Sequence, residues 1–138
     1  MIRGNSDERV LAYGSSEAPP EWQTHLQYTL LRWDCRHVSG ESVAFLRSLL
    51  EQRPVYIAGT DAIRVVHGSP RNQSESIYPD RDPDLLGSMV AQIAEPVMIC
   101  GHTHEPWNRQ LCGKLALNPG AVCGPLNGFV GAQYAILT

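Results

Sequence analysis

The feature that most constrains this 138-residue sequence is an apolar run that ends abruptly in a glycine and two histidines. The run Val97–Cys100 is typical of a buried strand, and Gly101-His102-Thr103-His104 follows it directly. A second short apolar run, Ile63–Val66, ends in the same way at His67. Layered α/β folds place ligands at strand ends that face a crevice, and neutral imidazole is the commonest metal ligand. The pattern therefore predicts a metal site built from these three histidines.

His102 and His104 are two residues apart, which places both side chains on one face of an extended segment. Their spacing of roughly 6–7 Å along the chain suits one metal after a bend, or two metals roughly 3.5–4 Å apart. Gly101 would allow the backbone to turn sharply there. The alternative is a pair of surface-loop histidines without a ligand, and the apolar run directly before them makes that alternative less favoured.

The first half of the chain carries helical patterns. Trp22, Leu26, Leu30 and Trp33 recur near helical spacing and predict a helix over residues 21–35, with the two tryptophans on its core face. Ser39 is a good N-cap for a second helix that stops before Pro54. His25 and His37 lie in this part and are interpreted as surface or packing residues.

The second half is mostly strand-like. Short β-type runs at residues 55–58 and 63–66, joined by Gly59-Thr60-Asp61, predict a hairpin. A short helix is expected near residues 84–94. Further strands are expected at residues 97–100, 110–112, 115–117 and 134–137. Helices followed mainly by strands favour an α+β fold over a strictly alternating parallel sheet.

The composition of the chain excludes some classes of binding partner. A net charge of −3 and scattered arginines give no basic face for a nucleic acid. No apolar stretch reaches the roughly 20 residues that a membrane span needs, and the first residues of the sequence are not followed by the apolar region of a signal peptide. The four cysteines lack CxxC spacing, so we expect reduced thiols and a cytoplasmic protein.

Four motifs resemble, in this order, those of the calcineurin-like metallophosphoesterases, and specifically their small bacterial and archaeal phosphodiesterase branch. They are Gly4-Asn5-Ser6-Asp7, Val66-His67-Gly68-Ser69-Pro70, Gly101-His102-Thr103-His104 and Asn118-Pro119-Gly120. The second and third motifs together are specific, whereas the first alone would be weak. The resemblance extends from residue 4 to the expected strand at residues 134–137.

The resemblance implies a layered β-sandwich flanked by helices, with a dinuclear metal site between the sheets. Asn5, His67 and His102 would bind one divalent metal ion, and His104 would face the second; Asn5 and His102 would also serve catalysis. Two metal ions would hold the phosphate and lower the pKa of the attacking water. The mixed nitrogen and oxygen ligands suit Mn, Fe, Zn or Ni.

The sequence departs from the family in its opening motifs. The Asp-x-His and Gly-Asp motifs, which supply the other ligands and the bridging carboxylate, would both lie before Met1. We therefore expect an N-terminally truncated chain: one domain over residues 1–138 that forms the C-terminal portion of the family's fold and lacks its opening strands and helix. Loss of the bridging carboxylate should weaken the metal pair, and with it the activity of this chain alone.

Three more residues bear on the chemistry. Ser6 stands where many relatives carry a histidine, and a hydroxyl cannot act as a general acid near neutral pH. Asp7 is interpreted either as a residue that orients a ligand or as a turn former. Arg71 could reach a substrate phosphate, although a solvated loop arginine is the simpler interpretation.

These observations predict a metal-dependent phosphoesterase that hydrolyses a phosphate ester, either a small molecule or a nucleotide-like compound. One alternative is a non-catalytic scaffold or remnant binding module with the same fold, and a second is a misplaced start of the gene product. Missing opening strands would uncover a sheet edge and apolar faces. We therefore expect a homo-oligomer or a partner chain to cover them.

Overall fold

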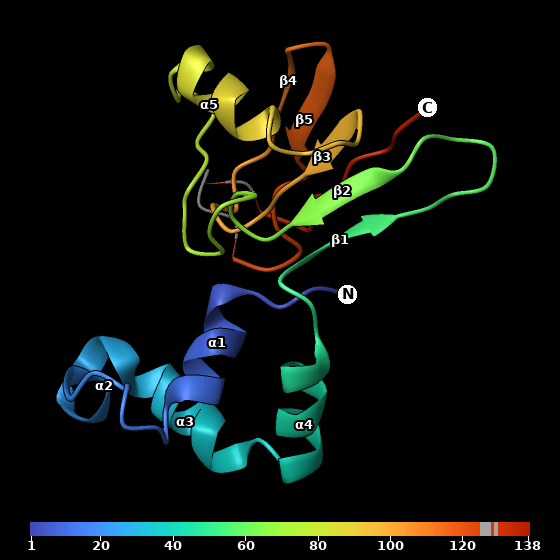
Figure 1. Ribbon diagram of the computed structural model, residues 1–138. Helices are drawn as coiled ribbons and strands as arrows, with labels where there is room; N and C mark the ends of the chain where they lie inside the picture. Colours follow the sequence, from blue (N-terminus) through green and yellow to red (C-terminus); the bar gives the residue numbers. More distant parts are fainter. Residues whose placement is uncertain (125–127, 129) are drawn as a thin grey trace. The chain divides into compact units, whose positions relative to one another are not determined.

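The computed structural model describes all residues except 125–127 and 129. The chain folds into two compact units (Figure 1). The helical unit comprises Arg3–Leu50 with Met1, and the sheet unit comprises Glu51–Thr138 with Ile2. The single domain expected over residues 1–138 stays a prediction. No helix of the described residues is long and apolar enough to cross a membrane.

The helical unit begins with a helix that sequence patterns did not indicate. Helix α1 spans Asn5–Ala12. Gly4 is its N-cap, and the backbone N–H of Gly4 donates a 2.8 Å hydrogen bond to Oδ2 of Asp7. Asp7 therefore satisfies a backbone donor at the start of the helix, where a negative charge is also favoured by the helix dipole. The remaining helices of this unit are α2 (Glu21–Thr24), a 3₁₀ turn (Leu26–Tyr28), α3 (Thr29–His37) and α4 (Gly40–Ser48).

The helix expected over residues 21–35 is interrupted. His25 has extended backbone angles (φ −74°, ψ 139°), which separate α2 from the 3₁₀ turn. The break changes which side chains face inward, so Leu31 is the buried residue of α3. Trp33 is 57% exposed, and the expectation that it packs in the core is wrong. The second helix begins as expected, because Oγ of Ser39 accepts a 3.0 Å hydrogen bond from the N–H of Ser42.

The sheet unit is built on a mixed five-stranded sheet in the order β1-β2-β3-β5-β4. Its strands are β1 (Gln52–Val55), β2 (Ile63–Val66), β3 (Val97–Ile99), β4 (Trp107–Leu111) and β5 (Lys114–Asn118). The central strands β2, β3 and β5 are parallel, and β1 and β4 are antiparallel edge strands. The two segments pair as an antiparallel hairpin, but its first strand is Gln52–Val55 rather than residues 55–58, and residues 56–62 form the connecting loop. The α+β class is confirmed.

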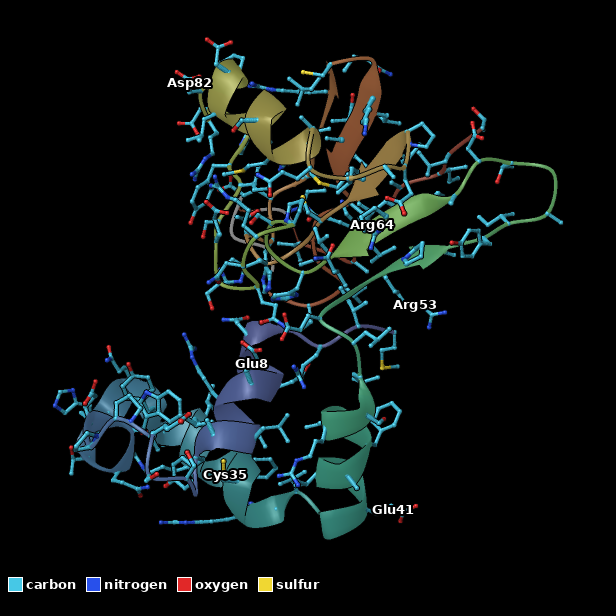
Figure 2. All side chains as sticks on the ribbon, in the orientation of Figure 1. Glu8, Cys35, Glu41, Arg53, Arg64 and Asp82 are labelled. Carbon is cyan, nitrogen blue, oxygen red and sulfur yellow. The ribbon has the colours of Figure 1, made fainter. Side chains whose placement is uncertain are left out.

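Helix α5 (Pro83–Val90) lies between β2 and β3 in the chain and contributes Leu86, Met89 and Val90 to the core. Asp82 caps it by accepting hydrogen bonds from the N–H groups of Asp84 and Leu85, and Pro83 occupies the first turn (Figure 2). Its apolar face belongs to the same buried cluster as one face of the sheet; the cluster includes Leu86, Met89, Val90, Val66, Met98, Ala116, Ile77 and Trp107. Burial of each large apolar side chain contributes about 1.5–3 kcal/mol. This core holds the carboxyl ends of β2 and β3 side by side.

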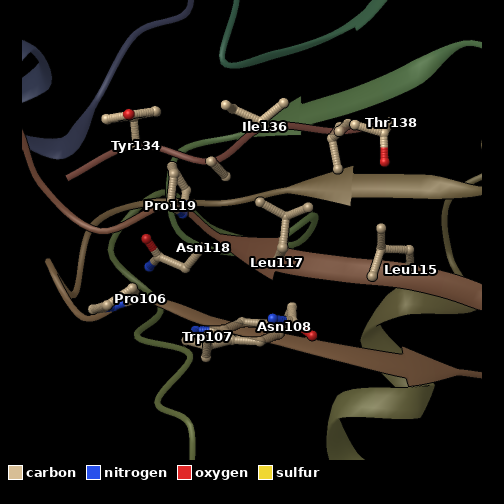
Figure 3. Close-up of a pocket in the computed structure, with 12 residues that line it drawn as sticks. Pro106, Trp107, Asn108, Leu115, Leu117, Asn118, Pro119, Tyr134, Ile136 and Thr138 are labelled. Atoms are coloured by element: carbon tan, nitrogen blue, oxygen red, sulfur yellow. The ribbon is translucent and has the colours of Figure 1, made fainter.

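A two-residue turn joins β4 to β5. Cys112 and Gly113 have φ values of 50° and 75°, the pattern of a turn that matches the twist of a tight hairpin. The strand expected at residues 134–137 does not form: this segment has no regular secondary structure, and Tyr134 and Ile136 are largely exposed. It lies across the face of the sheet rather than beside an edge strand, so its backbone has no ladder to join (Figure 3).

Candidate metal centre

The two histidine motifs meet where β2 and β3 end. The strands are parallel, with Val65 opposite Ile99. His67 follows β2 directly, and the N–H of Gly101 donates a 2.7 Å hydrogen bond to its carbonyl oxygen. The imidazole rings of His67 and His102 are 5.2 Å apart between centroids, inclined at 64°. Two imidazoles that share one ion through metal–nitrogen bonds of about 2.0–2.1 Å place their rings at roughly this separation.

The backbone bends sharply at the histidines themselves. His102 and His104 have φ values of 67° and 58°, whereas the expected flexible residue, Gly101, does not have a positive φ. The N–H of Thr103 donates a 2.7 Å hydrogen bond to the carbonyl oxygen of Gly101, so His102 is the centre of a three-residue γ-turn with positive φ. Such backbone strain costs about 1–3 kcal/mol per residue and concentrates at functional sites.

His104 is oriented by a backbone carbonyl. Its Nδ1 lies 2.7 Å from the oxygen of Gly124. A carbonyl accepts only from a protonated nitrogen, so Nδ1 carries a proton, and in the neutral ring Nε2 is the nitrogen with the lone pair. This is the usual arrangement of a metal-binding histidine.

The loop after His67 is held by Gly68 and Ser69. A Cβ atom on Gly68 would lie 2.6–2.8 Å from the carbonyl oxygens of Gln73, Glu75 and Asn72, so only glycine fits there. Oγ of Ser69 accepts hydrogen bonds from the N–H groups of Arg71 and Asn72, and it donates to Glu75. The loop therefore closes on itself directly after the first histidine.

Arg71 is engaged within this loop. Its Nε donates a 3.1 Å hydrogen bond to Glu75, and a second guanidinium nitrogen pairs with the other carboxylate oxygen. The hydrogen bonds from Arg71 hold the pKa of Glu75 below its ordinary value, although partial burial opposes the shift. Contact between Arg71 and a substrate phosphate stays a prediction, and it would require the arginine to share its donors with Glu75.

Next to the histidines, the end of β3 is buried from solvent. Cys100 is 2% exposed, and its thiol lies 3.5 Å from the carbonyl oxygen of Leu117. Burial raises the pKa of Cys100 to about 12, so this side chain stays a neutral thiol. It packs in the core and offers no anionic sulfur.

Asn118, the first residue of the Asn118-Pro119-Gly120 motif, supports the site. It is 2% exposed, and its amide joins the histidine loop to the end of β5. A groove of about 480 Å³ between β4, β5 and the final residues includes Asn118 but none of the three histidines (Figure 3). The groove is mainly the uncovered face of the sheet, so the histidine pair is the stronger candidate for chemistry.

Asn5 lies in the first turn of α1, in the helical unit. Asp7 lies one residue beyond Ser6 and caps that helix, as described above. Within the described residues, no group of three or more His, Cys, Asp or Glu side chains is close enough to hold a metal ion. The sheet unit therefore contributes two converging imidazoles, with His104 on the same loop. Two neutral nitrogen donors fit a transition metal ion and supply part of a complete ligand set.

The fold and this pair of motifs define an α+β protein with histidines at the carboxyl ends of adjacent parallel strands. The chain belongs to the calcineurin-like phosphoesterase superfamily, whose domain profile matches residues 1–138. It is 32% identical over 63 residues to a probable metallophosphoesterase of Methanothermobacter thermautotrophicus; that segment is 46% of this chain and 33% of the relative.

Two crystal structures share the fold. A metallophosphoesterase from Sphaerobacter thermophilus superposes with a TM-score of 0.66 at 24% identity, over 93% of this chain and 56% of the other. A hypothetical protein from Pyrococcus horikoshii superposes with a TM-score of 0.62 at 21% identity, over 86% and 50%. The chain thus spans about half the length of these structures.

Proposed function

We propose that this chain is a metal-dependent phosphoesterase that hydrolyses a phosphate ester at His67, His102 and His104. The observation that carries the proposal is the convergence of His67 and His102 where β2 and β3 end, with ring centroids 5.2 Å apart. Membership of the calcineurin-like superfamily supports the reaction class.

Each residue has a definite part in this proposal. His67 and His102 offer neutral nitrogen donors from adjacent strands, and the carbonyl of Gly124 holds His104 in the tautomer that offers Nε2. A divalent ion bound there would supply Lewis acidity toward the phosphoryl oxygen and an acidified water. The buried thiol of Cys100 keeps water from the underside of the loop.

Ser6 bears on the class of substrate. Its hydroxyl cannot protonate a leaving group near neutral pH, so the leaving group must depart as a stable anion. A diester with an acidic alcohol, such as bis-p-nitrophenyl phosphate, is the appropriate test compound. A phosphodiester whose leaving alcohol is acidic is the class of substrate that we propose.

The test combines metal content with turnover. The purified chain should bind Mn²⁺ and hydrolyse bis-p-nitrophenyl phosphate, and His102→Ala should lose both. His25→Ala is the matched control, because His25 is exposed in the helical unit and distant in sequence from both motifs. Equal turnover by the wild type and His102→Ala would contradict the proposal.

A second function, a scaffold without catalysis, has its own support. The described residues contain no cluster of three or more metal-ligating side chains, and the sequence contains no Asp-x-His motif. A folded chain that binds no Mn²⁺ and hydrolyses nothing would favour the scaffold.

A further inference from the structure

Asn118, at the end of β5, is a buried amide whose hydrogen bonds all go to two loops. Nδ2 donates to the carbonyl oxygen of Gly101 at 2.8 Å and to Oγ1 of Thr103 at 3.0 Å. Oδ1 accepts from the N–H of Gly120 at 2.9 Å. Asn118 and Thr103 are each 2% exposed, so these bonds are shielded from water. A buried amide with these partners is costly to replace.

The two residues that Asn118 holds are the two neighbours of His102. The carbonyl oxygen of Gly101 also accepts the hydrogen bond that closes the γ-turn around His102, from the N–H of Thr103. A histidine with a φ of 67° stays in this conformation only while its surroundings enforce it. Both ends of the strained turn are therefore fixed by one side chain.

We infer that Asn118 is a positioning residue: its amide holds the γ-turn at Gly101-His102-Thr103 and thereby sets the orientation of the His102 imidazole toward His67. Asn118 does not touch the metal ion or the substrate in this account. The inference rests on the proposed function for its consequence, tighter metal binding, but the positioning itself is a property of the metal-free chain. Residues that orient metal ligands typically change metal affinity about 10–100-fold when they are replaced.

The chemistry of the amide makes a sharp test available. Both Nδ2 hydrogens point at acceptors, and Oδ1 faces a donor, so the side chain has one satisfactory orientation. Asn118→Asp keeps the size and the acceptor for Gly120. It replaces the two donated hydrogens with a carboxylate oxygen that faces the carbonyl of Gly101. The variant therefore removes the restraint on the turn with little change in volume.

Asn108→Asp is the matched control. Asn108 lies on the neighbouring edge strand β4 and is exposed, so the same change of charge is made in the same sheet without touching the histidine loop. Thr103→Val is the second variant, because it removes one acceptor of Asn118 and leaves the bond to Gly101 in place. It decides the question if Asn118→Asp does not fold.

Two measurements on the full chain separate the outcomes. Calorimetric titration with Mn²⁺ should give an affinity about 10–100-fold lower for Asn118→Asp, a smaller loss for Thr103→Val, and no change for Asn108→Asp. Nitrogen-15 NMR of the metal-free imidazoles should show shifted or doubled His102 signals in Asn118→Asp, with His25 unchanged.

Unchanged His102 signals in both loop variants would overturn the inference, and so would an affinity loss that Asn108→Asp reproduces. A wild-type chain that binds no Mn²⁺ would instead count against the proposed function. The NMR comparison would still decide the role of Asn118.

Discussion

The N–H of Gly101 lies 2.7 Å from the carbonyl oxygen of His67, and this hydrogen bond joins the two histidine motifs. It lies two residues beyond the last paired residues of β2 and β3, Val65 and Ile99. Because this hydrogen bond joins the two backbones directly, it fixes the position of one histidine motif relative to the other. A disturbance of either loop therefore moves both histidines.

The first prediction concerns Gly68, which follows His67. We expect Gly68→Ala to destabilise the sheet unit by about 1–3 kcal/mol, because the new Cβ would meet three carbonyl oxygens at 2.6–2.8 Å. The measurement is urea unfolding followed by the amide NMR signals of β2 and β3. Gly40→Ala is the control, because no atom lies within 4 Å of a Cβ there. Equal unfolding midpoints for the two variants would contradict the packing described around Gly68.

The second prediction concerns the four thiols, which differ in burial and in pKa. Cys112 and Cys123 are exposed, Cys35 is half-buried with a pKa raised by burial and by Asp34, and Cys100 is buried. With a pKa of about 12, Cys100 has a thiolate fraction of about 10⁻⁴ at pH 8.

Iodoacetamide at pH 8 should therefore alkylate Cys112 and Cys123 first and Cys35 more slowly. Cys100 should react only after unfolding in urea, and peptide mass spectrometry resolves the order. Alkylation of Cys100 in the native chain at the rate of Cys112 would show that the end of β3 is open to solvent.

Much of the fold could be predicted because local signals agreed with the tertiary structure. Ser39 is a good cap wherever a helix follows it, and the strand before His67 follows from the β-type run at residues 63–66. The position of His67 beside His102 follows from two strands that end in histidine and pair in parallel. The cap and the strand ends need only the neighbouring residues, whereas the meeting of the two histidines also needs the parallel pairing of β2 and β3.

Other features depend on distant partners and were not predictable. The break at His25 changes the inward face of α3 and exposes Trp33, and no residue nearby marks it in the sequence. The segment at residues 134–137 has the composition of a strand but lies over the face of the sheet rather than beside one of its edge strands (Figure 3). The side chain of Asn118 makes three hydrogen bonds to two loops, and nothing in the sequence indicates that these loops lie beside it.

The third prediction concerns the N-cap of α4. Ser39→Ala should lower the stability of the helical unit by about 1 kcal/mol, because the N–H of Ser42 would lose its 3.0 Å hydrogen bond. Circular dichroism during urea unfolding measures the change. Ser48→Ala, at the other end of the same helix, removes an exposed hydroxyl that donates to the carbonyl of Phe45. Ser48→Ala should lower the stability of the helical unit by less than Ser39→Ala does. An equal loss in the two variants would show that the N-cap hydrogen bond adds no stability of its own.

The fourth prediction concerns the ion pair between Arg64, in β2, and Glu95, which precedes β3. Arg64 donates two hydrogen bonds to Glu95, at 3.0 Å from Nε and 2.7 Å from a terminal nitrogen (Figure 2 labels Arg64). The Glu95 side chain is only 9% exposed. The hydrogen bonds from Arg64 lower the pKa of Glu95 from its ordinary 4.5, although desolvation opposes them. Glu95→Gln should cost about 1–3 kcal/mol near pH 7.

The pH dependence gives this prediction its sign. Between the lowered pKa of the folded chain and the ordinary value of 4.5, the unfolded chain binds more protons at Glu95 than the folded chain. The contribution of the pair is therefore complete above pH 4.5 and is lost as the pH falls through the lower value. Urea unfolding, followed by the amide signals of β2 and β3, should show the largest difference between wild type and Glu95→Gln at neutral pH and a smaller difference in acid.

Glu17→Gln, an exposed change of equal charge in the helical unit, is the control, and its difference from wild type should not shrink in acid in this way. A wild-type advantage that stayed constant from pH 7 down to pH 3 would mean that the Glu95 carboxylate does not stabilise the sheet through its charge.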